Sequence, residues 1–148
     1  MRKTFEPGIT ATITLTSLGN GAGRISTKID NTKTRADRGR LWFRTKMGAV
    51  APTVGTPIKV YLVRHSDMAT NLADNALGAV DAAVTAEPVQ AECIGAIIVA
   101  AVADAVYEAS FALDRLPPQF SIVIWNATGQ ALSTTATHHI IQIVLEGH

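Results

Sequence analysis

The sequence predicts an all-β fold, an antiparallel β-sandwich of about eight strands in a single domain spanning residues 1–148. Apolar and polar residues alternate with a period of two along most of the chain, turns rich in Gly, Pro and Asn separate the alternating runs, and no segment carries a convincing helical period. At this length a domain buries roughly 68–70% of its unfolded surface. The single cysteine, Cys93, excludes an internal disulfide, so packing and hydrogen bonds must hold the core.

Four strands are predicted in the first half of the chain. Apolar residues and threonines alternate from Ile9 to Thr16, which is typical of a half-buried strand. In the second strand, Ile25 and Ile29 are expected on the same face. The predicted elements are an N-terminal arm at 1–8, strands at 9–16, 24–30, 41–47 and 58–65, a glycine turn at 18–23, a charged loop at 31–40 and a Gly/Pro loop at 48–57.

The second half opens with a long excursion at 66–88, which is rich in Ala, Asp and Asn, and we expect a short helix around 79–85. The alanine-rich run after it suits a helix or a buried strand, and Gly95 together with the β neighbours favours a strand. In the next strand, Tyr107 and the alternate residues up to Leu113 are expected to face inward. The predicted strands of this half lie at 91–100, 106–113, 119–126 and 139–146.

The strand at 119–126 begins only after Pro117 and Pro118, because proline cannot donate a backbone hydrogen bond. This strand is apolar on both faces, and such strands are buried on both faces or pair with another subunit. Its two faces hold Phe120, Ile122 and Ile124 on one side and Ser121, Val123 and Trp125 on the other. The turn after it needs a positive φ at Gly129.

The final strand places Ile141, Ile143 and Leu145 on one face. We therefore expect both strands to serve the core and a subunit contact.

Charge is divided unevenly along the chain. Residues 1–65 hold twelve basic and three acidic residues, a net +9, whereas residues 66–148 hold one basic and nine acidic residues, a net −8. The two halves could form faces that dock onto different neighbours or onto copies of the chain, because complementary potentials fix register. Alternatively, strands from the two halves alternate in the sandwich and neutralise one another, which we favour.

Residue patterns for catalysis and metal binding are absent from the sequence. His138 and His139 are adjacent, so on a strand they point to opposite faces, and no Cys or His lies at a zinc-ligand spacing. No Gly-x-Ser-x-Gly nucleophile elbow occurs, and Cys93 lies in an apolar run where a thiol is expected to be buried and inert. We predict no catalytic residues, no metal, no cofactor and no enzyme activity.

Other ligand classes leave weak signals. The basic stretch 24–46 contains Trp42, and a single-strand binder combines such charge with aromatic platforms. Trp42 is the only candidate platform, so we favour a solvated or subunit-facing basic loop and predict no nucleic-acid partner.

The longest apolar run is interrupted by Asp104 and is shorter than the ~20 residues of a membrane span, and the N-terminus shows no signal peptide. The Asn126-Ala-Thr sequence is interpreted as turn chemistry. Sugar-binding sandwiches display aromatic platforms, and the low aromatic content of 5% weighs against that class.

Several motifs resemble those of small virion proteins of tailed bacteriophages. In that group a first strand ends in Ser-Leu and leads to Arg-x-Ser and Asp-Asn, a Val-Tyr-Leu strand follows, and a Pro-Pro strand ends in Asn-x-Thr-Gly-x-x-Leu. The matching residues are Ser17, Leu18, Arg24, Ser26, Asp30, Asn31, Val60, Tyr61, Leu62, Pro117, Pro118, Asn126, Thr128, Gly129 and Leu132. The resemblance covers most of the chain from Ile9 onward, although the Ala-rich excursion and the few aromatic residues depart from it.

This resemblance implies a jelly-roll module that acts as a capsid decoration or cement protein on the phage head. Its expected partners are copies of the chain, a trimer being favoured, and the major capsid protein. The charge division would then serve to bridge neighbours on the shell. The alternative is a tail-associated receptor- or carbohydrate-binding module. The candidate interface residues are Lys33, Arg35, Arg38, Arg40, Trp42, Phe120, Trp125, Ile141 and Ile143.

Overall fold

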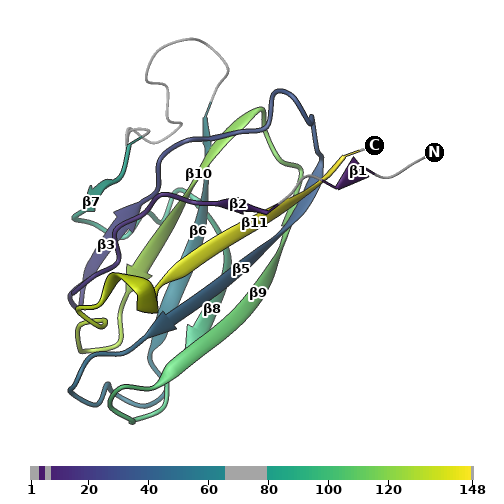
Figure 1. The fold of residues 1–148 in the computed structure, drawn as a ribbon. Helices are drawn as coiled ribbons and strands as arrows, with labels where there is room; N and C mark the ends of the chain where they lie inside the picture. Colours follow the sequence, from purple (N-terminus) through teal and green to yellow (C-terminus); the bar gives the residue numbers. More distant parts are fainter. Residues whose placement is uncertain (1–3, 6–7, 66–79, 148) are drawn as a thin grey trace.

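The computed structural model describes residues 4–5, 8–65 and 80–147, which form two antiparallel sheets packed face to face (Figure 1). Sheet A has the order β1-β11-β5-β9, with β2 also pairing with β11, and sheet B has the order β7-β3-β10-β6-β8, with β4 also pairing with β10. The strands of sheet A are β1 (Thr4–Phe5), β2 (Ile9–Thr10), β5 (Arg38–Lys46), β9 (Val106–Asp114) and β11 (Ile140–Gly147). Those of sheet B are β3 (Ala22–Ile25), β4 (Ile29–Asp30), β6 (Pro57–His65), β7 (Ala82–Val84), β8 (Glu92–Ile98) and β10 (Gln119–Asn126). The predicted β-sandwich is confirmed.

The strand pairing is that of a jelly roll. With β3 and β4 counted as two parts of one strand, and β1 and β7 set aside as additions, eight strands make up the sandwich. The first strand of the eight pairs with the last, the second with the seventh, the third with the sixth and the fourth with the fifth. Rolling up one long antiparallel hairpin produces this pattern, which is the jelly-roll arrangement.

This pairing explains the uneven charge along the sequence. Every strand pair joins a strand from residues 1–65 to one from residues 80–147, so strands from the basic and the acidic half of the chain alternate across both sheets. Five ion pairs among the described residues likewise join the two halves. They are Arg24–Asp81, Arg38–Asp114, Lys46–Asp104, Lys59–Glu87 and Arg64–Glu92. The interpretation that the two halves neutralise each other within the sandwich is confirmed.

The main core lies between the sheets and contains the face predicted to point inward on β9, together with one of the two predicted faces of β10 and of β11. Phe120, Ile122 and Ile124 of β10 and Ile141, Ile143 and Leu145 of β11 are all buried there. Leu113 of β9 is also buried, and Tyr107, Ala109 and Phe111 pack against the same core as expected. Phe111 lies directly against Gly95 of β8, where a Cβ atom would overlap its ring. Gly95 therefore provides the space in which the free edges of the two sheets meet.

A second, smaller core lies on the outer face of sheet B. It consists of Ile25, Tyr61, Val63, Val84, Val123 and Trp125. Residues 80–91, here called the strap, cover this face and contribute Val84 together with the partly buried Ala82 and Ala91. Strand β10 is therefore buried on both faces by its own chain, which is the first of the two outcomes predicted for an apolar strand of this kind.

The predicted strand 9–16 is wrong in extent, because only Ile9–Thr10 pairs as β2. The chain beyond it changes sheets. The Ala11 amide donates to the Ile141 carbonyl of sheet A at 2.9 Å, whereas the Thr12 carbonyl accepts from the Thr27 amide beside sheet B at 2.9 Å. The alternation in the sequence reports only which side chains face inward: Ala11 and Leu15 are buried.

Other boundaries also differ from the prediction. The strand at 24–30 splits into β3 and β4, so Ile25 enters the outer core and Ile29 the main core instead of sharing a face. The charged loop ends earlier than 40, because β5 begins at Arg38. The helix expected around 79–85 is wrong for the described residues, since Ala82–Val84 forms β7 and pairs with β3. Within the expected N-terminal arm, Thr4–Phe5 forms β1 against β11. Residues 66–79 of the predicted excursion lie outside the described residues.

Candidate interaction surfaces

The outward face of sheet A carries a row of exposed residues on its central strand. Residues of β5 alternate between buried and exposed, because successive side chains of a strand point to opposite faces. The exposed members, here called the β5 row, are Arg38, Arg40, Trp42 and Arg44. Three of them belong to the predicted interface. Hydrogen bonds to β11 on one side and β9 on the other hold this strand, so the row is presented on a rigid element.

A shallow groove of about 290 Å³ opens beside Trp42, whose side chain is 52% exposed. Trp42 lies opposite Ser110 of β9 and Gln142 of β11 in the strand register, and Arg44 lies opposite Glu108. The groove is lined by Trp42, Phe43, Arg44, Glu108, Ala109, Ile140 and Gln142. It therefore combines one exposed aromatic ring, that of Trp42, with side chains that donate and accept hydrogen bonds, while Phe43 is buried in the core.

The β4–β5 loop holds Lys33 and Arg35, the other exposed members of the predicted interface. Asn31 organises this loop: its side-chain Nδ2 donates to the Ala36 carbonyl at 2.8 Å, and its Oδ1 accepts from the Ala36 amide at 2.9 Å. Arg35 has a φ of 47°, so the loop is tightly folded around the buried amide. Both cations are exposed, and their loop leads into the first residue of β5.

The remaining predicted interface residues lie in the cores. Phe120, Ile141 and Ile143 are at most 1% exposed, and Trp125 is covered by the strap. A partner could contact these side chains only by displacing the residues that cover them. Their apolar pattern, which predicted both core and subunit contact, is accounted for by the two cores of the same chain.

One end of the sandwich forms an exposed apolar surface that the sequence analysis missed. The β5–β6 loop and the β8–β9 loop lie side by side there (Figure 1), because the Asp104 amide donates to the Gly48 carbonyl and the Gly55 amide to the Val99 carbonyl, both at 2.9 Å. Exposed apolar side chains lie on these loops and on the adjoining strand ends, where Ile98 faces outward from sheet B and Val106 faces outward from sheet A. They are Val50, Val54, Ile98, Val102 and Val106, each more than half exposed, and are here called the apolar end.

Charge is nearly absent from the apolar end. Loop residues 48–56 contain no Lys, Arg, Asp or Glu, and residues 99–105 contain only Asp104, which faces Lys46 at 3.8 Å. The neighbouring β10–β11 loop is also uncharged and is fixed by the buried Asn126, whose Nδ2 donates to the carbonyls of Leu18 and Gln130 at 2.8 Å. Asn126 thus performs the predicted turn chemistry, with Gly129 at a φ of 85°. Uncharged, valine-containing loops were the sequence signal that could have revealed this surface.

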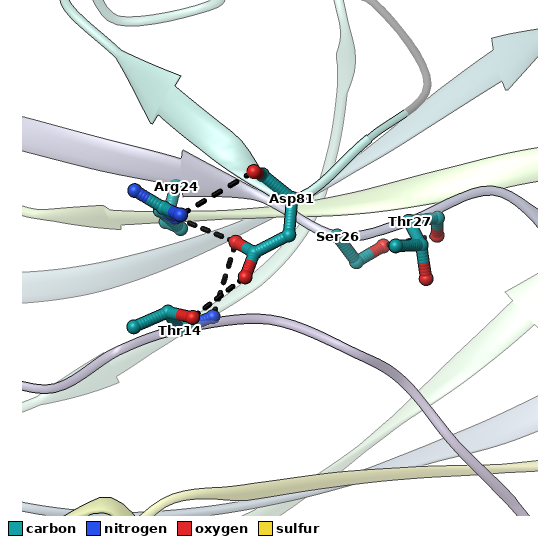
Figure 2. Close-up of polar contacts among 5 residues, drawn as sticks. All are labelled: Thr14, Arg24, Ser26, Thr27 and Asp81. Atoms are coloured by element: carbon teal, nitrogen blue, oxygen red, sulfur yellow. Dashed lines mark hydrogen bonds and ion pairs between the residues drawn. The ribbon is translucent and has the colours of Figure 1, made fainter.

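Two partly buried ion pairs hold the strap on sheet B, and Figure 2 shows the first of them. Arg24 Nε donates to Asp81 Oδ1 at 2.6 Å, and Thr14 donates to the same carboxylate from its amide (3.1 Å) and its hydroxyl (2.6 Å). Burial alone would raise the pKa of Asp81, but the hydrogen bonds from Arg24 and Thr14 outweigh it and lower that pKa. Asp81 is therefore a charged anchor between the β2–β3 segment and the strap.

The second ion pair joins Lys59 Nζ to Glu87 Oε1 at 2.5 Å, and the Tyr61 hydroxyl donates to the same oxygen at 2.5 Å. The hydrogen bonds from Lys59 and Tyr61 lower the pKa of Glu87. Burial, followed by the hydrogen bond to Glu87, raises the pKa of Tyr61. Both groups therefore keep one protonation state over the physiological range.

Cys93 differs from its predicted surroundings, whereas His138 and His139 lie at the entrance of a strand, as expected for polar residues there. Cys93 is exposed on β8, because its side chain is on the solvent side of an edge strand, so the expectation of a buried thiol is wrong. His138 and His139 precede β11: His138 ends the short 3-10 helix η1 (Ala136–His138), and His139 follows it. His139 Nε2 donates to the Ser133 carbonyl at 2.9 Å, and burial lowers the pKa of His139.

Within the described parts of the chain, no group of three or more His, Cys, Asp or Glu side chains is arranged to hold a metal ion. Nor is any helix among residues 4–5, 8–65 and 80–147 long and apolar enough to cross a membrane. No protein-family model and no curated protein matches the chain. The resemblance to bacteriophage virion proteins therefore stays a prediction.

Proposed function

We propose that the chain is a structural protein of a tailed bacteriophage particle, a decoration or cement protein that assembles with copies of itself and bridges major capsid protein subunits on the head. In this role it binds other proteins and catalyses no reaction. The observation that carries the proposal is the apolar end. Exposed apolar side chains grouped at one end of a domain are typical of protein interaction sites, because a partner that covers them removes apolar surface from water.

A second copy of the chain is the occupant that the charges favour. In a cyclic oligomer the same surface of each copy lies near the symmetry axis, so a charged end would bring like charges together. The apolar end avoids this repulsion, because its single acid, Asp104, already faces Lys46. The exposed cations Lys33 and Arg35 lie on a different loop and remain available for an acidic neighbour on the shell.

Oligomeric state tests the first part of the proposal. Light scattering of the purified chain is expected to give a trimer or another closed oligomer, and Val50→Glu with Val102→Glu is expected to yield monomers. Val89→Glu is the matched control, because Val89 is 77% exposed but lies on the strap. A monomeric parent chain, or an oligomer that survives the double substitution, contradicts assembly through the apolar end.

Location in the particle tests the second part. Immunogold labelling of intact phage with an antibody against the chain is expected to mark the head. Label confined to the tail would favour the alternative, a receptor- or carbohydrate-binding module, for which the exposed Trp42 on sheet A is the supporting observation. Absence of label from particles would contradict both roles. Reversing charge at Lys33 and Arg35 is expected to weaken retention on particles.

A further inference from the structure

The groove beside Trp42 contains the elements of a small-ligand site. Trp42 is on the central strand of sheet A, where hydrogen bonds to β9 and β11 fix its backbone, yet about half of its side chain is open to solvent. A large aromatic ring held on a rigid strand loses little entropy when a flat apolar surface stacks on it. Such a platform suits a ring whose face presents C–H groups.

The polar side chains around this platform are not used by the fold. In the described residues, no hydrogen bond or ion pair engages the side chains of Arg44, Glu108 or Gln142, although all three line the groove. Arg44 can only donate, Glu108 can only accept when ionised, and Gln142 can do both. Together they match a ligand with several hydroxyl groups, each of which donates and accepts.

The charge balance decides between ligand classes. One cation, Arg44, and one anion, Glu108, line the groove, so its own charge is neutral. A strand of nucleic acid needs a consistently basic groove, and the Glu108 carboxylate would repel its phosphates. At about 290 Å³ the groove is at the small end of ligand sites, which extend over roughly 300–1,000 Å³. Its size fits one or two rings.

From these observations we infer that the Trp42 groove binds a neutral sugar, with one pyranose face stacked on the indole and the hydroxyl groups bonded to Arg44, Glu108 and Gln142. The inference does not depend on a head or tail location. It differs from the assembly surfaces proposed above, because the apolar end lies on the loops beyond β5 and the cations Lys33 and Arg35 precede that strand.

Saturation-transfer NMR on the intact chain tests this site. The probes are methyl glycosides of glucose, galactose, mannose and N-acetylglucosamine, the disaccharides lactose and maltose, and a heparin oligosaccharide as the anionic comparison. At least one neutral probe is expected to receive saturation on its ring protons. Trp42→Ala is expected to weaken that binding by about tenfold or more, the effect of losing one stacking partner.

Control variants separate binding from folding. Glu108→Gln and Gln142→Ala are expected to reduce the same signal, whereas Val89→Ala, at an exposed apolar position on the strap outside the groove lining, is expected to leave it unchanged. An unchanged melting temperature shows that each variant is folded. The inference is overturned if no neutral probe binds, if only heparin binds, or if binding survives Trp42→Ala.

Discussion

Replacing Asp81 with Asn is expected to loosen the strap and lower the free energy of unfolding by about 1–2 kcal/mol. The carboxylate accepts three hydrogen bonds, one from Arg24 and two from Thr14, and its side chain is 18% exposed. A hydrogen bond to a charged group contributes ~1.5–3 kcal/mol. Asn keeps the shape and one acceptor oxygen, so the loss is smaller than the sum of these bonds.

The lowered pKa of Asp81 also predicts that the folded protein loses stability in acid. The pKa of Asp81 is lower in the folded than in the unfolded chain. The carboxylate therefore contributes fully to the free energy of unfolding above the ordinary pKa range of Asp, and this contribution is lost as pH falls through the pKa of the folded state. Glu87, whose pKa is also lowered, acts in the same direction. Stability is therefore expected to fall from about pH 4 downward. Asp81→Asn is expected to show a shallower fall, since one of the two titrating anchors is gone.

Urea unfolding and hydrogen exchange measure this effect together. In Asp81→Asn, amides of Ala82–Val84 are expected to exchange faster, while those of β10 change only as much as global stability does. Asn substitution at Asp114, whose contact with Arg38 is long and exposed, is the matched control and is expected to cost little. A change below about 0.3 kcal/mol with unaltered exchange in β7 would refute the anchoring role of Asp81.

Three further predictions concern the core and the strap. Gly95→Ala is expected to lower the melting temperature because its Cβ would overlap the Phe111 ring, and the double variant with Phe111→Leu is expected to recover part of the loss. Phe120→Ala, at a fully buried position, is expected to cost about 3–5 kcal/mol in urea unfolding. Glu87→Gln is expected to move the pKa of Tyr61 back toward its ordinary value, measured by ultraviolet titration of the phenol, because the hydrogen bond to the carboxylate helps to raise it.

The period-two pattern predicted most of the sandwich, because it reports directly which side chains are buried. It located β6, β9, β10 and β11 to within a few residues and identified the inward face of β9, whereas β8 was predicted from Gly95 and its β neighbours. For β10, whose two faces are both apolar, the prediction was burial on both faces or pairing with another subunit, and the structure shows the first of these. The pattern extended the first strand too far, since Ala11 and Leu15 face inward while their backbone passes from one sheet to the other.

What the sequence missed depends on contacts between distant segments. Strand β7 is short and alanine-rich, so its own β propensity is low. It forms because it pairs with β3 and buries Val84 in the outer core. Cys93 is exposed because β8 happens to be an edge strand, which only the strand order reveals. The groove at Trp42 likewise requires Glu108 and Gln142 from two strands that are far apart in sequence. Trp42 itself was identified, but as an interface residue.

The charge division has a structural consequence that differs from bridging two neighbours. Because strands from the basic and the acidic half of the chain alternate, the fold has no separate basic and acidic halves, and that support for a bridging role is lost. The uneven charge along the sequence instead disfavours incorrect pairing between neighbouring strands. A local hairpin of β5 with β6 would unite two basic strands, and one of β8 with β9 would unite strands carrying Glu92, Glu108 and Asp114. Opposite charges across strands contribute ~0.2–1 kcal/mol per pair, and like charges destabilise. The charges therefore favour the long-range jelly-roll pairs over the nearest hairpins, which loop-closure entropy alone would favour.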